Sequence, residues 1–310
     1  MAESVRVAVV GAGGVGGYFG GRLALAGAQV AWIARGPHLE SLRRGGLRVT
    51  SPGGDFHVGG LATDDPSEVG PCDYVLFCVK SYDTEGAARA LPPLLHDDTA
   101  VLTLQNGVDN PEKIASAVGW RHVMAGAAFV FATLQGPGQV AHLGGPGRVV
   151  FGEMNGARSA RAERLLTWFR RANVPAEVST DIRRVLWDKF AFICAQAGLT
   201  AATRLPVGEL REVPETWELF RRVLEEVRAV AAAEGVRLPE DTVDRHLQFA
   251  ARLEPQATSS LHHDLVHGRR MELEALHGTV VRLARKHELP VPISETVYGL
   301  LKPWARRAGA

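Results

Sequence analysis

Long apolar runs are missing from this chain of 310 residues. A membrane-spanning helix needs about 18 or more consecutive apolar residues, and no such run occurs, which argues against a membrane protein. Excess charge of one sign is also missing, since 35 Lys and Arg residues face 34 Asp and Glu residues, for a net charge of +1. A nucleic-acid or membrane-surface partner therefore has no electrostatic support.

Cysteine is scarce as well. Cys72, Cys78 and Cys194 are odd in number and lack the CxxC spacing of zinc and redox motifs. We interpret them as reduced thiols and expect a cytoplasmic protein. The N-terminal stretch MAESVRVAVV lacks the basic segment, apolar segment and cleavage site of a signal peptide. His263 and His267 have the i, i+4 spacing of a metal-binding pair, but no third ligand stands out, so we predict no metal site.

The composition is that of an ordinary globular protein, with 46% hydrophobic and 22% charged residues. A chain of this length usually forms more than one core. Strand-like runs alternate with helical segments up to about residue 180, and helical periodicity dominates after it. We therefore predict an α/β protein with two domains. Residues 1–180 form a Rossmann-type doubly wound sheet, and residues 181–310 form an all-helical domain.

A glycine-rich turn follows the first strand-like run. The run Val5–Val10 fits a buried parallel strand, residues 18–26 fit a helix, and Gln29–Ile33 fits the next strand. The turn between them matches GxGxxG, the dinucleotide-binding motif, in the βαβ context that the motif requires. We expect a tight turn, close backbone approach to a pyrophosphate, and helix–strand contact at its three glycines in order. The predicted cofactor-binding residues of this turn are Gly11, Gly13, Gly14, Val15 and Gly16.

The end of the second strand bears on which dinucleotide binds. NAD sites usually place an acidic residue about 20 residues after the first glycine, where it binds the ribose 2′-hydroxyl. Between Gly11 and Leu39 there is no Asp or Glu, and Arg35 stands at the strand end. A guanidinium there suits a 2′-phosphate, and a missing carboxylate removes repulsion. A solvated surface charge is the other interpretation. We predict NADPH rather than NADH.

Further strand-like runs follow along the first domain. Residues 47–62 indicate two short strands around a Pro-Gly-Gly turn, outside the main sheet. Residues 123–153 indicate antiparallel hairpins. Buried strands are predicted at 72–80 and 99–105, and polar residues follow both. Because ligands of open α/β sheets bind beyond the carboxyl ends of the strands, Lys80 and Asn106 are candidates for the site, although solvated strand ends are common.

Lys189 opens a run of apolar and small residues at the start of the helical domain, FAFICA. A cation at the edge of such a run needs an explanation. The side chain either extends to the surface or meets negative charge in a site. Residues alone leave both open.

The chain resembles the ketopantoate (2-dehydropantoate) reductase family. The similarity runs through nearly the whole sequence and includes these stretches: VVGAGGVGGYFGGRLALAGAQVAWIARGPHLESLR, VKSYDT, LQNGVDN, GPGQVAHLG, WDKF and TSSLHHDLVHGRRMELEAL. The resemblance implies an N-terminal domain that binds NADPH and a helical domain that receives a 2-oxo acid, reduced to a hydroxy acid. It also implies a place in pantothenate and coenzyme A biosynthesis.

The resemblance also implies roles for single residues. Lys189 matches the family's catalytic lysine, which stabilises and protonates the oxygen that gains charge. Glu272 matches a glutamate that binds substrate and supports the reaction, and Ser260 matches a serine that binds the substrate carboxylate. Asn106 matches an asparagine at the nicotinamide and substrate edge, and Lys80 a lysine near the cofactor ribose and substrate. In the same comparison the 2′-phosphate arginine falls on Arg35.

Three positions depart from the family pattern. Ile193, Ala197 and Val207 stand where the best-described members carry asparagines. Gln196 and Thr200 lie on roughly the Lys189 face of the predicted helix and are candidates to replace those amides. Since losing a hydrogen-bonding partner changes substrate discrimination, another 2-oxo acid is an alternative substrate. A non-catalytic NADPH-binding module is a weaker alternative, and fold analogy suggests a homodimer.

Overall fold

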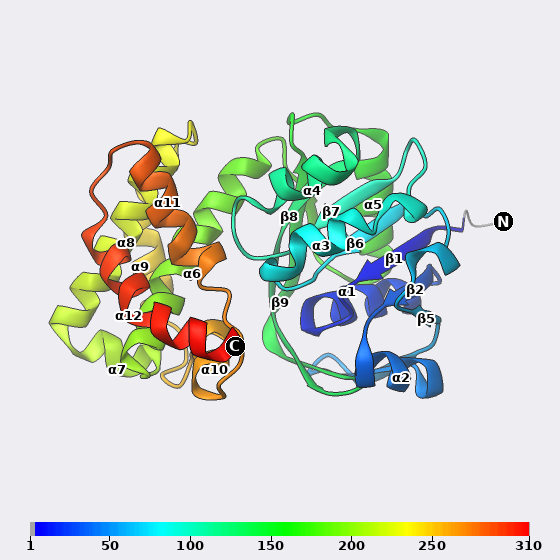
Figure 1. Ribbon diagram of the computed structural model, residues 1–310, viewed down its shortest axis with the longest axis horizontal. Coiled ribbons are helices and arrows are strands. Elements are labelled where there is room, and N and C mark those ends of the chain that lie inside the picture. Colours follow the sequence, from blue (N-terminus) through cyan, green and yellow to red (C-terminus); the bar gives the residue numbers. More distant parts are fainter. Residues whose placement is uncertain (1–3, 310) are drawn as a thin grey trace. The chain divides into compact units, whose positions relative to one another are not determined.

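The computed structural model describes residues 4–309. The N-terminal stretch in which we predict no signal peptide includes residues 1–3, which lie outside the described residues. The chain divides into two compact units (Figure 1). The first unit runs up to Gln105 and continues over Asn110–Ile182, and the second combines Asn106–Asp109 with the chain from Arg183 onward. The assignment of cofactor and substrate to separate domains stays a prediction.

A ten-stranded sheet forms the centre of the first unit. The strand order is β4-β3-β9-β8-β7-β6-β1-β2-β5, and β10 pairs with β9. Strands β8, β7, β6, β1, β2 and β5 are parallel neighbours, whereas β8 and β9 form an antiparallel hairpin. The strands are β1 Arg6–Val10, β2 Gln29–Ile33, β3 Leu47–Thr50, β4 Phe56–Val58, β5 Leu61–Thr63, β6 Tyr74–Phe77, β7 Ala100–Thr103, β8 Val123–Gly136, β9 Gln139–Glu153 and β10 Ala176–Val178.

Strand β1 shows how the sheet is covered on both faces. Val7 and Val9 belong to one apolar cluster, whereas Ala8 and Val10 belong to a second. Side chains of a strand alternate between its faces, so the two clusters lie on opposite sides of the sheet. The first cluster includes residues of α1 (Gly14–Leu25) and α5 (Ala160–Arg171), and the second includes residues of α3 (Thr84–Arg89) and α4 (Asn110–Val118). The predicted α/β fold with a Rossmann-type doubly wound sheet is confirmed.

Two parts of the sheet differ from the sequence-based predictions. The segment expected to lie outside the sheet belongs to it: β3 pairs in parallel with β9, β4 pairs with β3, and β5 extends the other edge beside β2. Residues 123–153 form one long hairpin rather than several short ones. The register of that hairpin shifts between Phe129 and Ala132. The first error concerns pairing between distant segments, which local patterns do not specify.

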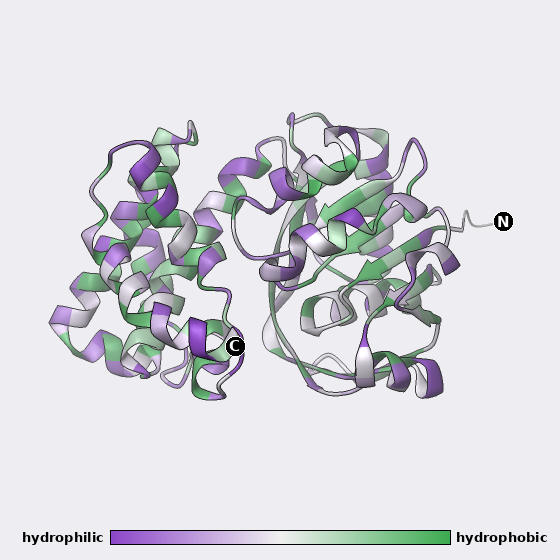
Figure 2. Cartoon of the chain, in the orientation of Figure 1, coloured by the Kyte–Doolittle hydropathy of each residue, from purple (hydrophilic) through white to green (hydrophobic). Residues whose placement is uncertain are grey.

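The second unit is helical, as predicted, and no strand follows β10 in the chain up to residue 309. On α8 the side chains of Phe220, Leu224, Val227 and Ala231 are buried. Hydrophobic residues lie on the inward-facing sides of these helices and along the strands of the first unit (Figure 2). The helices are α6 Ile182–Thr203, α7 Val207–Glu212, α8 Pro214–Ala233, α9 Thr242–Ala251, α10 Ser260–Val266, a π-helical turn Glu274–Gly278, α11 Thr279–Lys286 and α12 Pro292–Gly309.

None of the helices between residues 4 and 309 combines the length and the apolar character needed to cross a membrane.

Candidate active site

The glycine-rich turn has the geometry expected of a pyrophosphate site. Gly11 has a backbone φ of 93°, which residues other than glycine rarely adopt. At Gly16 an added Cβ would collide with the Gly11 carbonyl oxygen and crowd Val9 of β1, so helix and strand are in close contact. Gly13 is different, because an added Cβ would meet nothing within 4 Å. The space beside Gly13 is therefore open to a ligand.

Helix α1 begins at Gly14, four residues before the predicted start at Tyr18. No side chain caps its first turn, and no acidic residue lies there. The first N–H groups of a helix lack partners within the helix and carry its positive dipole end. Such a terminus suits a phosphate group. The residues of the turn therefore fit the pyrophosphate of a dinucleotide.

His38 supports the glycine turn from α2 (Gly36–Gly45). Its Nδ1 accepts a hydrogen bond from the Gly138 N–H at 2.9 Å, so Nε2 carries the proton and donates to the Ala12 carbonyl at 2.8 Å. Burial lowers the pKa of His38, which keeps this neutral tautomer. The imidazole thereby joins the turn to the loop between β8 and β9. The sequence-based reasoning missed His38.

Arg35 lies directly before α2, at the end of β2, as expected. Its guanidinium forms an ion pair with Asp83, with Nη2 and Oδ2 2.7 Å apart. Asp83 ends the short turn Ser81–Asp83 that follows β6, and β6 and β2 both flank β1. The carboxylate that is missing from residues 11–39 is thus supplied by a segment far along the chain. Lys80 directly precedes that turn and is partly buried.

The second unit brings Lys189 and Asn106 together. Lys189 lies near the start of α6, and its Nζ donates a hydrogen bond to Asn106 Oδ1 at 3.0 Å. Burial lowers the pKa of Lys189 to about 8, because an ammonium loses hydration in apolar surroundings. The side chain therefore does not extend into solvent; it meets an amide oxygen. A lysine with a pKa near neutrality is suited to donating a proton.

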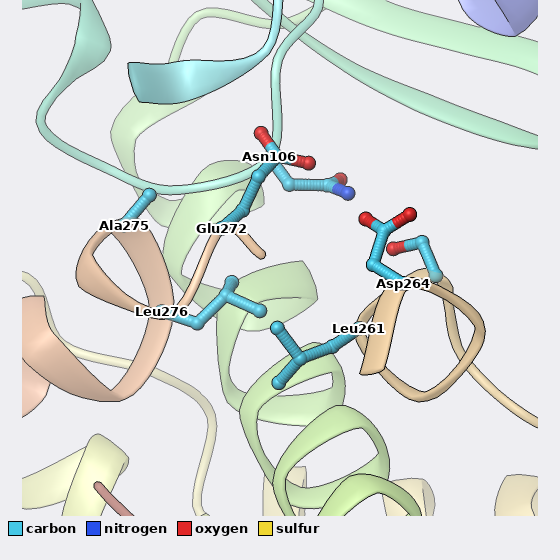
Figure 3. Close-up of a pocket in the computed structure, with 7 residues that line it drawn as sticks. Asn106, Leu261, Asp264, Glu272, Ala275 and Leu276 are labelled. Atoms are coloured by element: carbon cyan, nitrogen blue, oxygen red, sulfur yellow. The ribbon is translucent and has the colours of Figure 1, made fainter. Parts of the chain in front are cut away.

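A pocket in the second unit collects three of the predicted site residues. Asn106, Ser260 and Glu272 line it together with Asp264, and Leu261, Ala275 and Leu276 complete it (Figure 3). Ser260 is the first residue of α10, and Glu272 directly precedes the turn before the π-helical residues. Through its bond to Asn106, Lys189 lies one side chain away from this pocket. The arrangement combines an ammonium, an amide, a hydroxyl and carboxylates around a small space.

Asp264 is a pocket residue that the sequence-based reasoning missed. It is nearly buried and lies on α10, four residues after Ser260. Residues four apart occupy the same face of a helix. This spacing could have identified Asp264 from the sequence. If Ser260 faces the site, Asp264 on the same helix face does so too.

Gln196 and Thr200 are buried on α6 and contact the segment before Ser260. Gln196 Nε2 donates to the Thr258 carbonyl at 3.3 Å, and the Thr200 hydroxyl lies 2.9 Å from Ser259 Oγ. The Ser259 hydroxyl in turn accepts from the His262 N–H and caps α10. Both side chains therefore hold the start of the helix that carries Ser260. They are not among the residues that line the pocket in the described chain.

The three positions that carry apolar residues in place of family asparagines lie in different surroundings. Ala197 and Val207 belong to the buried core, with exposed fractions of 2% and 0%. Ile193 is partly buried on α6. Apolar side chains are what the core surroundings of the first two positions require.

His263 and His267, the pair with metal-binding spacing, contact their own segment. His263 Nε2 lies 3.0 Å from the Thr258 hydroxyl, and His267 Nδ1 lies 2.8 Å from the His263 carbonyl. In residues 4–309 no group of three or more His, Cys, Asp or Glu side chains has the arrangement of a metal site.

A doubly wound sheet with a glycine turn in one unit, and a polar pocket with a buried lysine bonded to its lining in a helical second unit, define the class of dinucleotide-dependent oxidoreductases. Comparison with known proteins places the chain within that class. The family model described as ketopantoate reductase PanE/ApbA matches residues 7–156, and the model of its C-terminal part matches residues 181–305.

Named relatives agree with the family models. The chain is 39% identical to a 2-dehydropantoate 2-reductase of Halobacterium salinarum, over 96% of this chain and 98% of that protein. It is 33% identical to one of Archaeoglobus fulgidus, over 96% and 97%. The crystal structure of a PanE/ApbA family ketopantoate reductase from Ralstonia eutropha superposes with a TM-score of 0.90, at 38% identity, covering 98% of this chain and 100% of that one.

The chain belongs to the ketopantoate reductase family. It is accordingly an NADP-dependent oxidoreductase that acts on CH–OH groups. D-mandelate dehydrogenase, in a structure with NADH and anilino(oxo)acetate, shares the fold with a TM-score of 0.89 at 23% identity.

Proposed function

We propose that this protein reduces 2-dehydropantoate (ketopantoate) to pantoate with NADPH. The observation that carries the proposal is the hydrogen bond between Lys189 and Asn106 beside the pocket lined by Ser260 and Glu272. A 2-oxo acid presents a carboxylate and a ketone oxygen, and this set offers donors for both. The proposal includes a cytoplasmic homodimer whose product enters pantothenate and coenzyme A biosynthesis.

Bound NADPH supplies a hydride to the ketone carbon, and the electron pair of the C=O π bond moves to oxygen. Lys189 stabilises that oxygen with its ammonium and gives it a proton, which completes the hydroxy acid. Asn106 holds the ammonium in place through its amide oxygen. Ser260 donates to the substrate carboxylate, and Glu272 orients the substrate. Gln196 and Thr200 do not contact the substrate in this proposal. They position Ser260 by fixing the start of α10.

On the cofactor side, Gly11, Gly13, Gly14, Val15 and Gly16 form the pyrophosphate turn in this proposal. Arg35 faces the 2′-phosphate, and Lys80 and Asn106 lie toward the ribose and nicotinamide. The open space at Gly13 and the uncapped α1 terminus support the assignment.

The pKa of Lys189 predicts the pH dependence of the reaction. The lysine must be protonated to act as the acid, and its pKa is about 8. We expect kcat/KM to be constant below that pH and to fall about tenfold per pH unit above it. Steady-state rates from roughly pH 6 to pH 10 measure this, with NADPH kept saturating. A profile that stays flat through pH 9 contradicts proton donation by Lys189.

A second candidate is the NADPH-dependent reduction of another 2-oxo acid. Ile193, Ala197 and Val207 favour it, because apolar residues replace three amides of the family pattern. Where those amides bind substrate in the family, apolar residues in their place favour a substrate with fewer hydroxyl groups.

Oxidation of NADPH, followed by its absorbance, tests these proposals. The purified protein is offered ketopantoate beside 2-oxo acids with straight, branched and aromatic side chains. Ketopantoate should give the highest kcat/KM of the panel. If another 2-oxo acid of the panel gives a higher kcat/KM than ketopantoate, the second candidate function is the correct one. Binding of NADPH without oxidation by any of the acids would favour the non-catalytic alternative.

A further inference from the structure

The ion pair between Arg35 and Asp83 lies where the two nicotinamide cofactors differ. NADPH carries a phosphate on the adenosine ribose and NADH a hydroxyl, and this group lies beyond the second strand of a Rossmann sheet. Arg35 occupies that position, and Asp83 Oδ2 is 2.7 Å from its Nη2. A 2′-phosphate approaching Arg35 therefore meets a carboxylate as well.

The backbone position of Asp83 makes the pair notable. Asp83 lies directly before α3, but its backbone is helical, with φ −102° and ψ −1°, whereas a capping aspartate is extended. Its side chain makes no such cap here. The carboxylate instead bonds Arg35, which lies 48 residues earlier in the chain. Helix capping thus gives no account of Asp83, whereas the ion pair does.

The chemistry of the two cofactors differs toward this pair. A phosphate competes with Asp83 for the guanidinium and is repelled by the carboxylate, while a 2′-hydroxyl can donate a hydrogen bond to the same carboxylate. Arg35 favours NADPH and Asp83 opposes that preference. The side chains are 76% and 33% exposed, so the effect is moderate and sensitive to salt.

We propose that Asp83 is a specificity-determining residue that limits the preference for NADPH and preserves binding of NADH. The inference rests on the proposed use of NADPH. According to this proposal, Asp83 holds Arg35 in place when no 2′-phosphate is present. It accepts the 2′-hydroxyl when NADH binds.

Calorimetric titration of wild-type protein and Asp83→Asn with NADP⁺ and NAD⁺ tests this inference at low salt. We expect the variant to bind NADP⁺ about 3- to 10-fold more tightly and NAD⁺ about 3-fold more weakly. Both changes should shrink as salt is raised. Asp83→Ala, which removes the charge and the acceptor together, should act in the same direction.

Asp97→Asn is the matched control. Asp97 forms an exposed ion pair with Arg121, with the two atoms 3.2 Å apart, before the amino end of β7. It should change neither affinity.

A double-mutant cycle adds the coupling between the two residues. Arg35→Ala should weaken NADP⁺ binding less in the wild-type background than in Asp83→Asn, because Asp83 competes with the phosphate for the guanidinium in the wild-type protein. Equal shifts for NADP⁺ and NAD⁺ in Asp83→Asn overturn the role of Asp83. Preference for NAD⁺ by wild-type protein, with no change in the variant, overturns the use of NADPH as well, so the two failures are distinguishable.

Discussion

Replacing Lys189 by alanine is expected to reduce kcat by about 10²- to 10⁴-fold, the range that a positioned general acid contributes. The ammonium of Lys189 donates to Asn106 at 3.0 Å beside the pocket, and its loss leaves the ketone oxygen without that charge and proton. NADPH affinity should stay nearly unchanged, because the glycine turn and Arg35 belong to the other unit. Single-turnover oxidation of NADPH, with binding titrations alongside, separates the two effects.

Two further variants control this experiment. Lys189→Met keeps most of the side-chain volume without the charge, and it should lose as much activity as the alanine variant. Lys286→Ala removes a lysine of the same unit from an exposed ion pair with Glu234 and should leave kcat intact. Near-normal turnover in either Lys189 variant would remove this residue from the mechanism.

Gly13 and Gly14, adjacent in the glycine-rich turn, should respond to alanine in opposite ways. At Gly13 a methyl group meets open space and the backbone is already extended, with φ near −74°. Gly13→Ala should therefore fold normally but weaken NADPH binding by about tenfold or more, because the methyl group occupies the space beside the helix terminus. At Gly14 the methyl group would collide with the backbone of Ala132 and Thr133 in β8. Gly14→Ala should lower the free energy of unfolding by about 1–3 kcal/mol.

Thermal or denaturant unfolding, together with titration of NADPH, checks both variants. Gly45→Ala is a control that should change neither stability nor NADPH binding. Gly45 is exposed, and an added Cβ there meets nothing within 4 Å. The assignment of the turn fails if Gly13→Ala binds NADPH as well as the wild-type protein. If Gly14→Ala has the same free energy of unfolding as the wild-type protein, the backbone of β8 at Ala132 must shift to make room for the methyl group.

Much of the site follows from local signals. The turn from Gly11 to Gly16 and the position of Arg35 depend on features within one βαβ unit. Asn106, Ser260 and Glu272 came from resemblance, since each is unremarkable alone. That they line one pocket is a property of the folded second unit. His38 and Asp83 were missed because their partners lie in other segments. Asp264 was missed although it lies four residues after Ser260 on the same helix.

The sequence by itself determined the α/β class, the strand–turn–helix start, the change to helices after about residue 180, and the glycine-rich turn. These features depend on side-chain periodicity and on backbone angles that only glycine adopts readily. Tertiary structure alone decided that β3 and β4 join the sheet, that Gly14 has no room for a side chain, and that Asp83 faces Arg35. Each of these depends on contacts between segments far apart in sequence, and those contacts are set by how complementary surfaces pack, not by the pattern within either segment.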